Sequence, residues 1–311
     1  MSPTVINMGA ELFPGFVERR IDTGGAQIFA RVGGTGPALL LLHGYPQSHV
    51  MWHRVIARLA AHFTVVAADL RGYGQSSCPP TDMEHRPYSK RVMALDMVRL
   101  MTALGHREFS VMAHDRGARV GYRMALEHPD RLRRLVLLDI LTTLDQWQIH
   151  SQQAKIRMFH WGFLAQPAPI PESLIRRATA DWVEGPFKRA TQAKSISVID
   201  PRALAAYRAV FTDPDHVHAT CEDFRAGASC DMADDEEDAA AGRKIACPTL
   251  FLWGTTGTPS DVADPLALWQ RWCDRVEGHS IDSGHFLPEE NPDDLLARAL
   301  PFLLDRKVGP T

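Results

Sequence analysis

The sequence predicts an α/β fold: a mostly parallel eight-stranded sheet with helices on both faces and an inserted helical cap. Short runs of aliphatic and β-branched residues alternate along the chain with amphipathic segments of helical length. This alternation is typical of a parallel sheet that helices cover on both sides. The alternation breaks after residue 140, where helical patterns follow one another without a strand.

The sheet is expected to consist of a hairpin and six further strands. Gly24 and Gly25 separate the two hairpin strands, because a glycine pair gives the backbone freedom that a tight turn needs. The expected strands cover 16–23, 26–32, 38–42, 64–68, 109–113, 135–138, 249–253 and 276–281. Amphipathic patterns predict helices at 52–61, 89–104 and 118–127.

The long helical stretch divides the chain into two parts. Residues 141–225 are rich in aromatic residues and prolines and are expected to form the cap, with one helix over 156–163. Residues 1–140 and 226–311 are expected to form the core. The acidic run that follows the cap, 231–238, is expected to be a solvated surface helix or loop without a function.

Composition narrows the class of protein. A chain of 311 residues can bury a sizeable core, and a net charge of −3 without a basic patch indicates no nucleic-acid partner. Five widely spaced cysteines lack any C-x-x-C pair, so neither a disulfide framework nor a zinc site is indicated. No signal segment opens the chain, and no apolar run approaches the ~20 residues that cross a membrane. We expect a cytoplasmic protein that acts on a small molecule without a cofactor or metal.

Asp115 stands at the point where a predicted strand gives way to a predicted helix. Ala113 and Gly117 lie two positions before and after it. This spacing resembles the nucleophile turn of the α/β hydrolases, whose sharp bend needs small neighbours. The usual serine pattern, G-x-S-x-G, occurs nowhere in the chain. An aspartate in this place can also be a helix cap, but the elements described below favour a nucleophile.

An aspartate nucleophile points to a particular substrate class. A serine that attacked a saturated carbon would form an ether, which is a dead end. Aspartate forms an ester, whose carbonyl carbon can then be attacked by a water that a histidine activates. The expected substrate is therefore a saturated carbon with a leaving group, which means an alkyl halide or an epoxide.

A base and an orienting acid accompany the nucleophile in this fold, and the base comes last in the chain. His285 follows the last expected strand and is the expected base. Many α/β hydrolases place the acid at the position that Gly257 occupies here. Asp139 directly follows a strand, and we expect it to orient His285 in preference to Asp261 or Asp264.

The loop His43-Gly-Tyr-Pro46 offers a site for a developing oxyanion. It follows an expected strand and can direct the N–H of Tyr45 at the oxyanion, with the N–H of Arg116 as the second donor. The alternative is that this loop is only a turn closed by Gly44 and Pro46.

Two arginines predict an anionic substrate. Arg116 follows the nucleophile directly, where haloalkane dehalogenases and epoxide hydrolases typically carry tryptophan, and Arg119 comes one helical turn later. Two guanidinium groups on one helix face can bind a carboxylate together, although Arg119 could instead form an ordinary salt bridge. If both face the site, the substrate is a 2-halocarboxylic acid. His160 and Trp161, on the expected cap helix, offer ring N–H groups to a departing halide, or they only pack in the cap.

Six segments together resemble the haloacetate (fluoroacetate) dehalogenases, and the resemblance spans nearly the whole chain. The segments are His43–Trp52, His114–Arg119, Leu138–Ile140, Phe159–Ala168, Cys221–Gly227 and Ser283–Glu289. The resemblance implies an α/β-hydrolase fold and a homodimer. It also implies Asp115 as nucleophile, His285 as base and Asp139 as its partner. The remaining roles that it implies are carboxylate binding by Arg116 and Arg119, and halide binding by His160 and Trp161.

One position departs from the family pattern. Fluoroacetate-cleaving members carry a tyrosine in the halide pocket where this chain has Phe224, so the shape of the pocket is kept and a hydroxyl donor is lost. Fluoride depends most on hydrogen bonds, which counts against fluoroacetate and leaves chloroacetate and bromoacetate as the expected substrates. Tyr207 is the only tyrosine within the expected cap.

The sequence therefore predicts a hydrolase that converts a haloacetate to glycolate through an ester on Asp115. An epoxide hydrolase is the first alternative. It would need hydroxyl groups in the cap, usually two tyrosines, to protonate the opening ring, and Phe224 argues against it. The second alternative is a protein of hydrolase fold that binds a ligand without turnover, because a fold alone does not establish a function.

Overall fold

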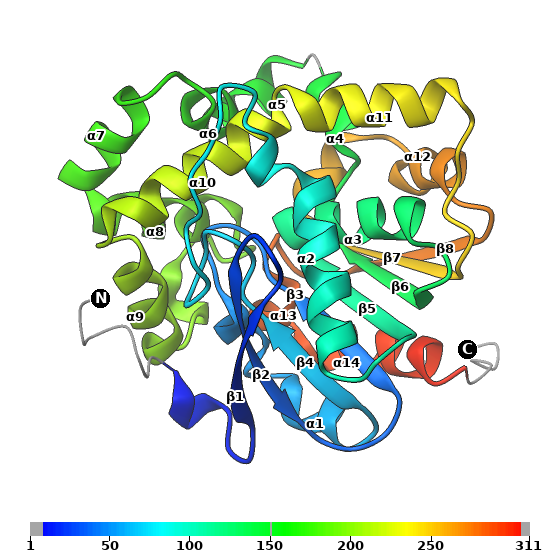
Figure 1. Cartoon of the computed structure of the whole chain (residues 1–311). Coiled ribbons are helices and arrows are strands. Elements are labelled where there is room, and N and C mark those ends of the chain that lie inside the picture. Colours follow the sequence, from blue (N-terminus) through cyan, green and yellow to red (C-terminus); the bar gives the residue numbers. More distant parts are fainter. Residues whose placement is uncertain (1–8, 150, 306–311) are drawn as a thin grey trace.

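The computed structural model describes residues 9–149 and 151–305, and an eight-stranded sheet forms its centre (Figure 1). The strands are β1 Val17–Asp22, β2 Gln27–Gly33, β3 Ala38–Leu42, β4 Thr64–Ala68, β5 Phe109–His114, β6 Leu132–Leu138, β7 Thr249–Gly254 and β8 Val276–Ile281. Their order across the sheet is β1-β2-β4-β3-β5-β6-β7-β8. β2 pairs antiparallel with β1 and with β4, and all other neighbours are parallel. The predicted fold class is confirmed.

Helices cover both faces of the sheet, because its central strands are apolar on both sides. Every residue of β3 and β5 is buried. Successive side chains of β5 point to opposite faces: Ala113 packs near Gly121, whereas His114 contacts Phe286. Figure 1 shows α2 and α3 in front of the strands. The core helices are α1 Ile56–Ala60, α2 Lys90–Ala103, α3 Asp115–Glu127, α12 Pro265–Trp272, α13 Leu287–Glu290 and α14 Pro292–Leu303.

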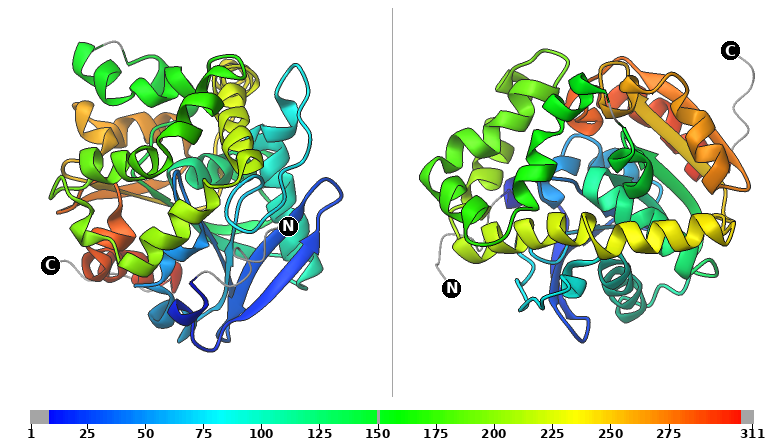
Figure 2. Two further views of the ribbon diagram at one scale, coloured as in Figure 1. Left: turned by 90° about the vertical axis from the view of Figure 1, so that its left-hand side faces the viewer. Right: turned by 90° about the horizontal axis from the view of Figure 1, so that it is seen from above.

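Only helices occur between β6 and β7 in the described part of that segment. They gather over one end of the sheet (Figures 1 and 2). The helix expected over 156–163 is divided in two, because Met158 leaves the helical conformation between α5 and α6. The predicted cap boundary at residue 225 falls inside α10, and the division into core and cap stays a prediction. The helices are α4 Thr143–Trp147, α5 Gln152–Arg157, α6 Phe159–Leu164, α7 Ile170–Arg177, α8 Thr179–Ala190, α9 Pro201–Val210, α10 Pro214–Gly227 and α11 Cys230–Ala240.

The acidic run after the expected cap is a helix, as one of the two expectations had it, but only one of its faces is solvated, so the expectation of a solvated run is only partly right. The run forms most of α11, and four of its aspartates are buried along one helix face. Arg123 of α3 pairs with Asp235 at 2.7 Å and also with Asp238, and Lys90 of α2 pairs with Asp231 at 3.0 Å. Buried carboxylates need such partners, so ion pairs attach α11 to the two helices in front of the sheet.

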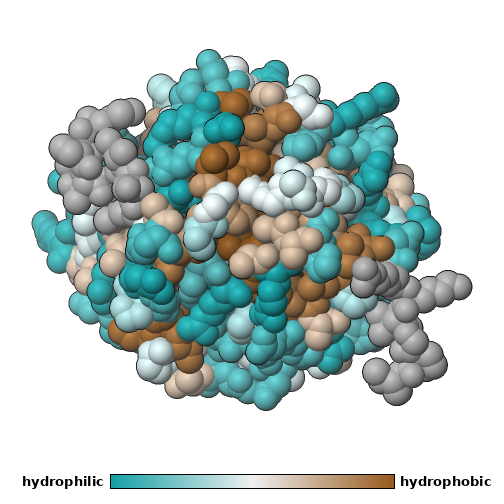
Figure 3. Space-filling model, turned by 90° about the horizontal axis from the view of Figure 1, so that it is seen from below, coloured by the Kyte–Doolittle hydropathy of each residue, from teal (hydrophilic) through white to brown (hydrophobic). Residues whose placement is uncertain are grey.

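No helix among the described residues is long and apolar enough to span a membrane. Figure 3 shows the molecule from below, where hydrophilic residues surround several hydrophobic areas. Apolar atoms contribute much of the surface of any folded protein, so this face by itself indicates no partner.

Candidate active site

The chain bends sharply at Asp115. β5 ends at His114 and α3 begins at Asp115, whose φ of 46° lies in the left-handed region that aspartate tolerates better than most residues. A Cβ atom at Gly117 would lie 2.3 Å from the carbonyl oxygen of His43. The small residue after the bend therefore has a steric reason, because the start of α3 packs directly on the loop after β3.

One oxygen of the Asp115 carboxylate is bound by that loop. The amide of Tyr45 donates to Oδ2 of Asp115 at 2.9 Å. Gly44 permits this approach, since a Cβ atom there would lie 2.6 Å from Cβ of Asp115. Arg116 is the second residue of α3, so its amide is one of the first four N–H groups that have no partner within a helix. The two predicted oxyanion donors thus lie on segments that meet at Asp115.

The structure also brings His285 and Asp139 together. Nδ1 of His285 lies 2.5 Å from Oδ2 of Asp139. Asp139 directly follows β6, and the amides of Gly254 and Thr258 donate to its carboxylate at 2.8 and 2.9 Å. Such bonds favour the ionised carboxylate and fix its position. Asp139 therefore orients the imidazole through Nδ1 and leaves Nε2 as the other ring nitrogen.

The position of Asp139 explains why no acid is needed after β7. A Cβ atom at Gly257 would lie 2.0 Å from Oδ1 of Asp139. Because β6 and β7 are neighbours in the sheet, a carboxylate that follows either strand reaches the same point. Of the two alternatives, Asp264 is the N-cap of α12 and accepts from the amide of Ala267 at 2.9 Å. The side chain of Asp261 lies outside the described residues.

Burial and charge set the protonation of these groups. Burial would raise the pKa of Asp115, but the nearby histidines and arginines outweigh it and hold that pKa below the ordinary value. Burial would lower the pKa of His285, but the hydrogen bond and charge of Asp139 outweigh it and raise that pKa. Burial lowers the pKa of His160 to about 3. At neutral pH, Asp115 is thus a carboxylate and His160 is a neutral imidazole with one N–H.

Arg119 differs from the other two arginines on α3. Arg116 and Arg123 each pair with a buried carboxylate, at 2.8 and 2.7 Å. Arg119 is only 1% exposed, its Nη1 donates to the neutral hydroxyl of Thr143 at 3.3 Å, and its Nε has no hydrogen-bond partner. No ion pair joins it to a carboxylate within the described ranges. A buried cation without a counter-charge is unfavourable, so this guanidinium is available to an anion.

Arg116 is bound by Asp223 of α10. Its Nε and Nη2 both donate to the Asp223 carboxylate at 2.8 Å. The guanidinium stands 4.1 Å over the ring of Phe224, and its Nη1 has no hydrogen-bond partner. Sequence reasoning missed Asp223, and no local pattern could have revealed it, because its partner lies 107 positions away. The role predicted for the Arg116 side chain stays a prediction.

The predicted halide-site residues form one aromatic cluster. The ring of Phe224 lies 6.0 Å from that of His160 and 5.9 Å from that of Trp161, both on α6. Nδ1 of His160 is buried without a hydrogen-bond partner. Tyr207 does not join the cluster, since its hydroxyl donates to Oε1 of Glu289 at 2.5 Å. The hydroxyl that Phe224 lacks is therefore not replaced by Tyr207.

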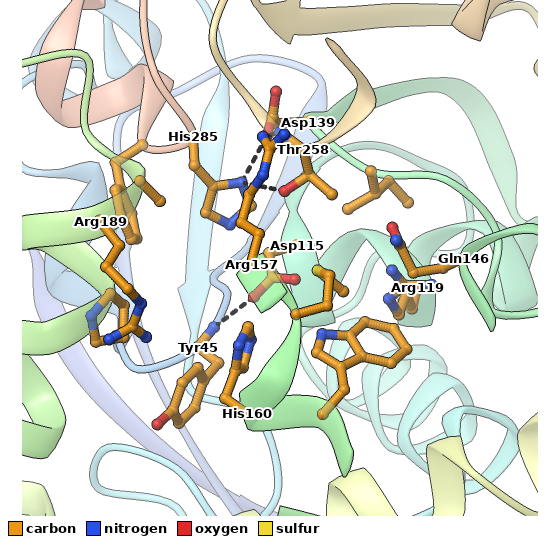
Figure 4. A pocket seen from close by; sticks show the side chains of 16 residues that line it. Tyr45, Asp115, Arg119, Asp139, Gln146, Arg157, His160, Arg189, Thr258 and His285 are labelled. Atoms are coloured by element: carbon orange, nitrogen blue, oxygen red, sulfur yellow. Dashed lines mark hydrogen bonds and ion pairs between the residues drawn. The ribbon is translucent and has the colours of Figure 1, made fainter. Parts of the chain in front are cut away.

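A cavity of about 60 Å³ brings the candidate groups together (Figure 4). Asp115, Arg119 and His285 line it, with His160 and Trp161 on the side of the helical segment. Arg116 and Phe224 are not among its lining residues. Nothing in the described part of the chain groups three or more histidine, cysteine or acidic side chains in a way that could hold a metal ion.

Several lining residues were missed by sequence reasoning. Gln146 of α4 lines the same side of the cavity as Arg119 in Figure 4, and its Oε1 has no hydrogen-bond partner. Arg157 of α5, Arg189 of α8 and Thr258 also line the cavity. A polar residue on an amphipathic helix or in a turn has the same pattern whether it faces solvent or a cavity, so only the folded chain reveals these four.

Comparisons with known proteins place the chain among hydrolases. A family model described as alpha/beta hydrolase fold matches residues 37–292. A fluoroacetate dehalogenase from Burkholderia sp is 40% identical over 96% of this chain and 97% of that protein. A soluble epoxide hydrolase from Corynebacterium sp. (strain C12) is 31% identical over 86% of this chain and 91% of that protein.

Similar solved structures belong to the same classes of protein as these relatives. A Nostoc sp PCC 7120 protein, provisionally assigned as an alpha/beta hydrolase, is 45% identical with a TM-score of 0.89, over 93% of this chain and 98% of that one. A Pseudomonas aeruginosa protein, provisionally assigned as an epoxide hydrolase, is 41% identical with a TM-score of 0.88, over 94% and 97%. The relatives thus include both enzyme classes that an aspartate nucleophile suggests.

Proposed function

Because the chain belongs to the α/β hydrolase family, with a dehalogenase and epoxide hydrolases among its relatives, we propose that it cleaves the carbon–halogen bond of a short 2-haloacid. Chloroacetate would give glycolate and chloride. Asp115 is the proposed nucleophile, His285 the base and Asp139 the residue that orients the base.

The observation that carries the proposal is Arg119. It lines the same cavity as the Asp115 carboxylate and has no carboxylate partner among the described residues. A guanidinium binds a carboxylate with two parallel hydrogen bonds. An anionic substrate would satisfy Arg119, and the positive charge would offset the repulsion between that substrate and Asp115.

The first chemical step is a displacement. Oδ1 of Asp115 forms a bond to the carbon that carries the halogen, the carbon–halogen bond breaks, and the halide leaves with the electron pair. The result is an ester on Asp115. We assign the halide to the N–H groups of His160 and Trp161, because both rings line the cavity and a neutral imidazole still has one N–H to donate.

The second step is hydrolysis of the ester. His285 takes a proton from water, and the hydroxide attacks the carbonyl carbon of the ester. The amide of Tyr45 already binds Oδ2, the oxygen that becomes negative at this stage, and the amide of Arg116 is the proposed second donor. The bond between the carbonyl carbon and Oδ1 then breaks. Oδ1 leaves as the hydroxyl oxygen of glycolate with the proton from His285, and the water oxygen stays in the Asp115 carboxylate, whose remaining proton goes to solvent.

The charge on Asp115 couples the two steps. In the resting enzyme that charge is one of the causes that raise the pKa of His285. The ester is neutral, so its formation removes this contribution and makes His285 give up its proton more readily. Formation of the ester therefore also favours the neutral form of His285, which is the form that can take a proton from water.

The size of the cavity supports a short substrate. A water-sized group needs ~10–15 Å³ of such space, so a cavity of about 60 Å³ holds roughly four to six of them. Chloroacetate fits this limit. A phenyl-substituted epoxide exceeds it unless the helices above the site move.

An epoxide hydrolase remains the second candidate because of the relatives that carry that name. Ring opening needs a donor to the epoxide oxygen, and the hydroxyl of Tyr207 is engaged by Glu289. Phe224 has no hydroxyl to offer. Both facts favour the haloacid over the epoxide as substrate. A protein that binds a ligand without turnover is the third candidate.

Halide release tests the proposal. The purified protein is incubated with bromoacetate, chloroacetate, fluoroacetate and styrene oxide, beside the Asp115→Asn variant. We expect halide and glycolate from bromoacetate and chloroacetate, and none from the variant. Diol from styrene oxide without halide from any haloacetate would identify an epoxide hydrolase, and no product from any substrate would refute both enzymes. The homodimer and the cytoplasmic location stay predictions.

A further inference from the structure

A second, larger cavity lies outside the first. Its volume is about 530 Å³, and it shares five lining residues with the inner cavity. Those shared residues are Arg157, Arg189, Ala190, Thr258 and His285. Because they border both spaces, the outer cavity is the approach to the proposed catalytic groups on the side of His285.

The outer cavity is lined by cations. Arg157 and Arg189 border it at the neck, and Lys194 borders only the outer space. In the view of Figure 4, Arg157 and Arg189 stand on either side of His285. None of the residues described as lining this cavity is an aspartate or a glutamate. A small anion that enters therefore meets positive charge before it meets the buried Arg119.

Two of these charges are not neutralised by an ion pair. The Arg189 guanidinium stands 5.0 Å over the ring of Phe159, and Nζ of Lys194 donates to the carbonyl oxygen of Arg189 at 2.9 Å. Among the described residues, no carboxylate forms a salt bridge with either side chain. An aromatic ring and a carbonyl group hold Arg189 and Lys194 in place without cancelling their charge.

We propose that Arg189 and Lys194 make the outer cavity an anion-guiding entrance, which attracts short halocarboxylates and leads them to the inner cavity. The proposal rests on the proposed function for the identity of the anion. Charges of one sign around a cleft concentrate counter-ions there and speed their association. Because these residues border the path and not the reacting carbon, they should act on capture of the substrate more than on its chemistry.

The expected effect has a defined size and salt dependence. A unit charge at several ångström in water changes the local concentration of an opposite ion about two- to threefold. Removing one such charge should therefore raise KM for chloroacetate about two- to threefold and leave kcat nearly unchanged. Between about 0.01 M and 0.15 M salt the Debye length falls from about 30 Å to about 8 Å, so the difference should shrink as salt is added.

The test compares Arg189→Gln, Lys194→Gln and the double variant with wild type. Lys244→Gln is the matched control, because Lys244 is exposed and precedes β7 at the opposite end of that strand from the entrance. We expect the double variant to show a KM for chloroacetate raised about four- to ninefold at low salt, with a shallower salt dependence than wild type. Lys244→Gln should behave as wild type. Equal KM values and equal salt dependence in all proteins would overturn the proposal.

A second readout does not depend on turnover. Iodide and acrylamide both quench tryptophan fluorescence, and Trp161 borders the inner cavity. At low salt, the double variant should lose part of its quenching by iodide and keep its quenching by neutral acrylamide. Unchanged iodide quenching would refute the entrance even if the protein releases no halide. If the double variant shows reduced iodide quenching but the wild-type protein has no activity on haloacetates, the anion-guiding entrance is supported and the proposed function is refuted.

Discussion

The amide of Tyr45 donates to Oδ2 of Asp115 at 2.9 Å, so the backbone already binds the carboxylate oxygen that would carry the negative charge during ester hydrolysis. This bond leaves Oδ1 as the oxygen that attacks the substrate. In the ester, Oδ1 is the bridging atom and Oδ2 is the carbonyl oxygen, and the same amide serves both steps. Displacement and hydrolysis can be separated by substitution, because only hydrolysis needs the base.

Replacement of His285 by asparagine should stop the reaction at the ester. The displacement needs no base, so halide should still be released once per active site, and the carboxymethyl group should stay on Asp115. Mass spectrometry after incubation with chloroacetate should find the added mass on the peptide that contains Asp115. Asp115→Asn is the control, because asparagine also tolerates the positive φ at this position, and it should show neither halide nor added mass. Release of halide by His285→Asn without any labelled peptide would exclude the covalent route.

Replacement of Arg119 by lysine should weaken the use of anionic substrate. The charge is kept and the two-pronged geometry is lost, so we expect kcat/KM for chloroacetate to fall by about 1.5–3 kcal/mol of transition-state stabilisation, which is the range for hydrogen bonds to charged groups. Chloroacetamide is the matched neutral substrate, and its kcat/KM should change much less. If the ratio of kcat/KM for the two substrates is the same in Arg119→Lys and wild type, Arg119 does not bind the carboxylate.

The pKa of His285 should fall when Asp115 loses its charge. Asp139 and Asp115 both raise that pKa above its ordinary value in the resting enzyme, and the neutral ester keeps only the contribution of Asp139. The neutral form of His285 needed for hydrolysis increases as pH rises through the pKa that His285 has in the ester, so kcat should rise with pH in that range. NMR titration of His285 in Asp115→Asn should give a lower pKa than in wild type. An equal or higher value in the variant would mean that Asp115 does not influence the base.

The order of elements and the grouping of Asp115, Asp139 and His285 could be predicted because each leaves a local signal. Buried parallel strands are continuous apolar runs, and Asp115 and Asp139 each follow such a strand. His285 comes after the largely exposed edge strand β8, and its place late in the chain was the signal for it. The identity of the acid was also accessible, since Gly257 removes a carboxylate from one of the two loops that converge there.

Partners across long sequence separations could not be predicted. The aspartates of α11 look like a solvated run until α2 and α3 place Lys90 and Arg123 opposite them. The same limit hides the pairing of Arg116 with Asp223 and therefore the difference between Arg116 and Arg119. Sequence spacing put both arginines on one helix face, but only tertiary packing decides which of them has a buried counter-charge.

Restoring a hydroxyl at position 224 should shift the enzyme toward fluoroacetate. Phe224 is 2% exposed and packs beside His160 and Trp161, so Phe224→Tyr adds one donor to the aromatic cluster proposed for the halide. Fluoride is small and a poor leaving group, and a donor placed for the transition state can contribute roughly 2–4 kcal/mol, as an oxyanion-hole donor does. Chloride and bromide should gain much less.

The measurement for this variant is the ratio of kcat on fluoroacetate to kcat on chloroacetate, in wild type and in Phe224→Tyr. Phe211→Tyr is a suitable control, because Phe211 is also buried and packs on Tyr45 but does not contact the His160 or Trp161 ring. We expect the ratio to rise only in Phe224→Tyr. The cavity is not lined by Phe224 in the resting structure, so a rise would also show that the ring tip reaches the halide once substrate is bound. An unchanged ratio in a folded Phe224→Tyr protein would place the halide away from this ring.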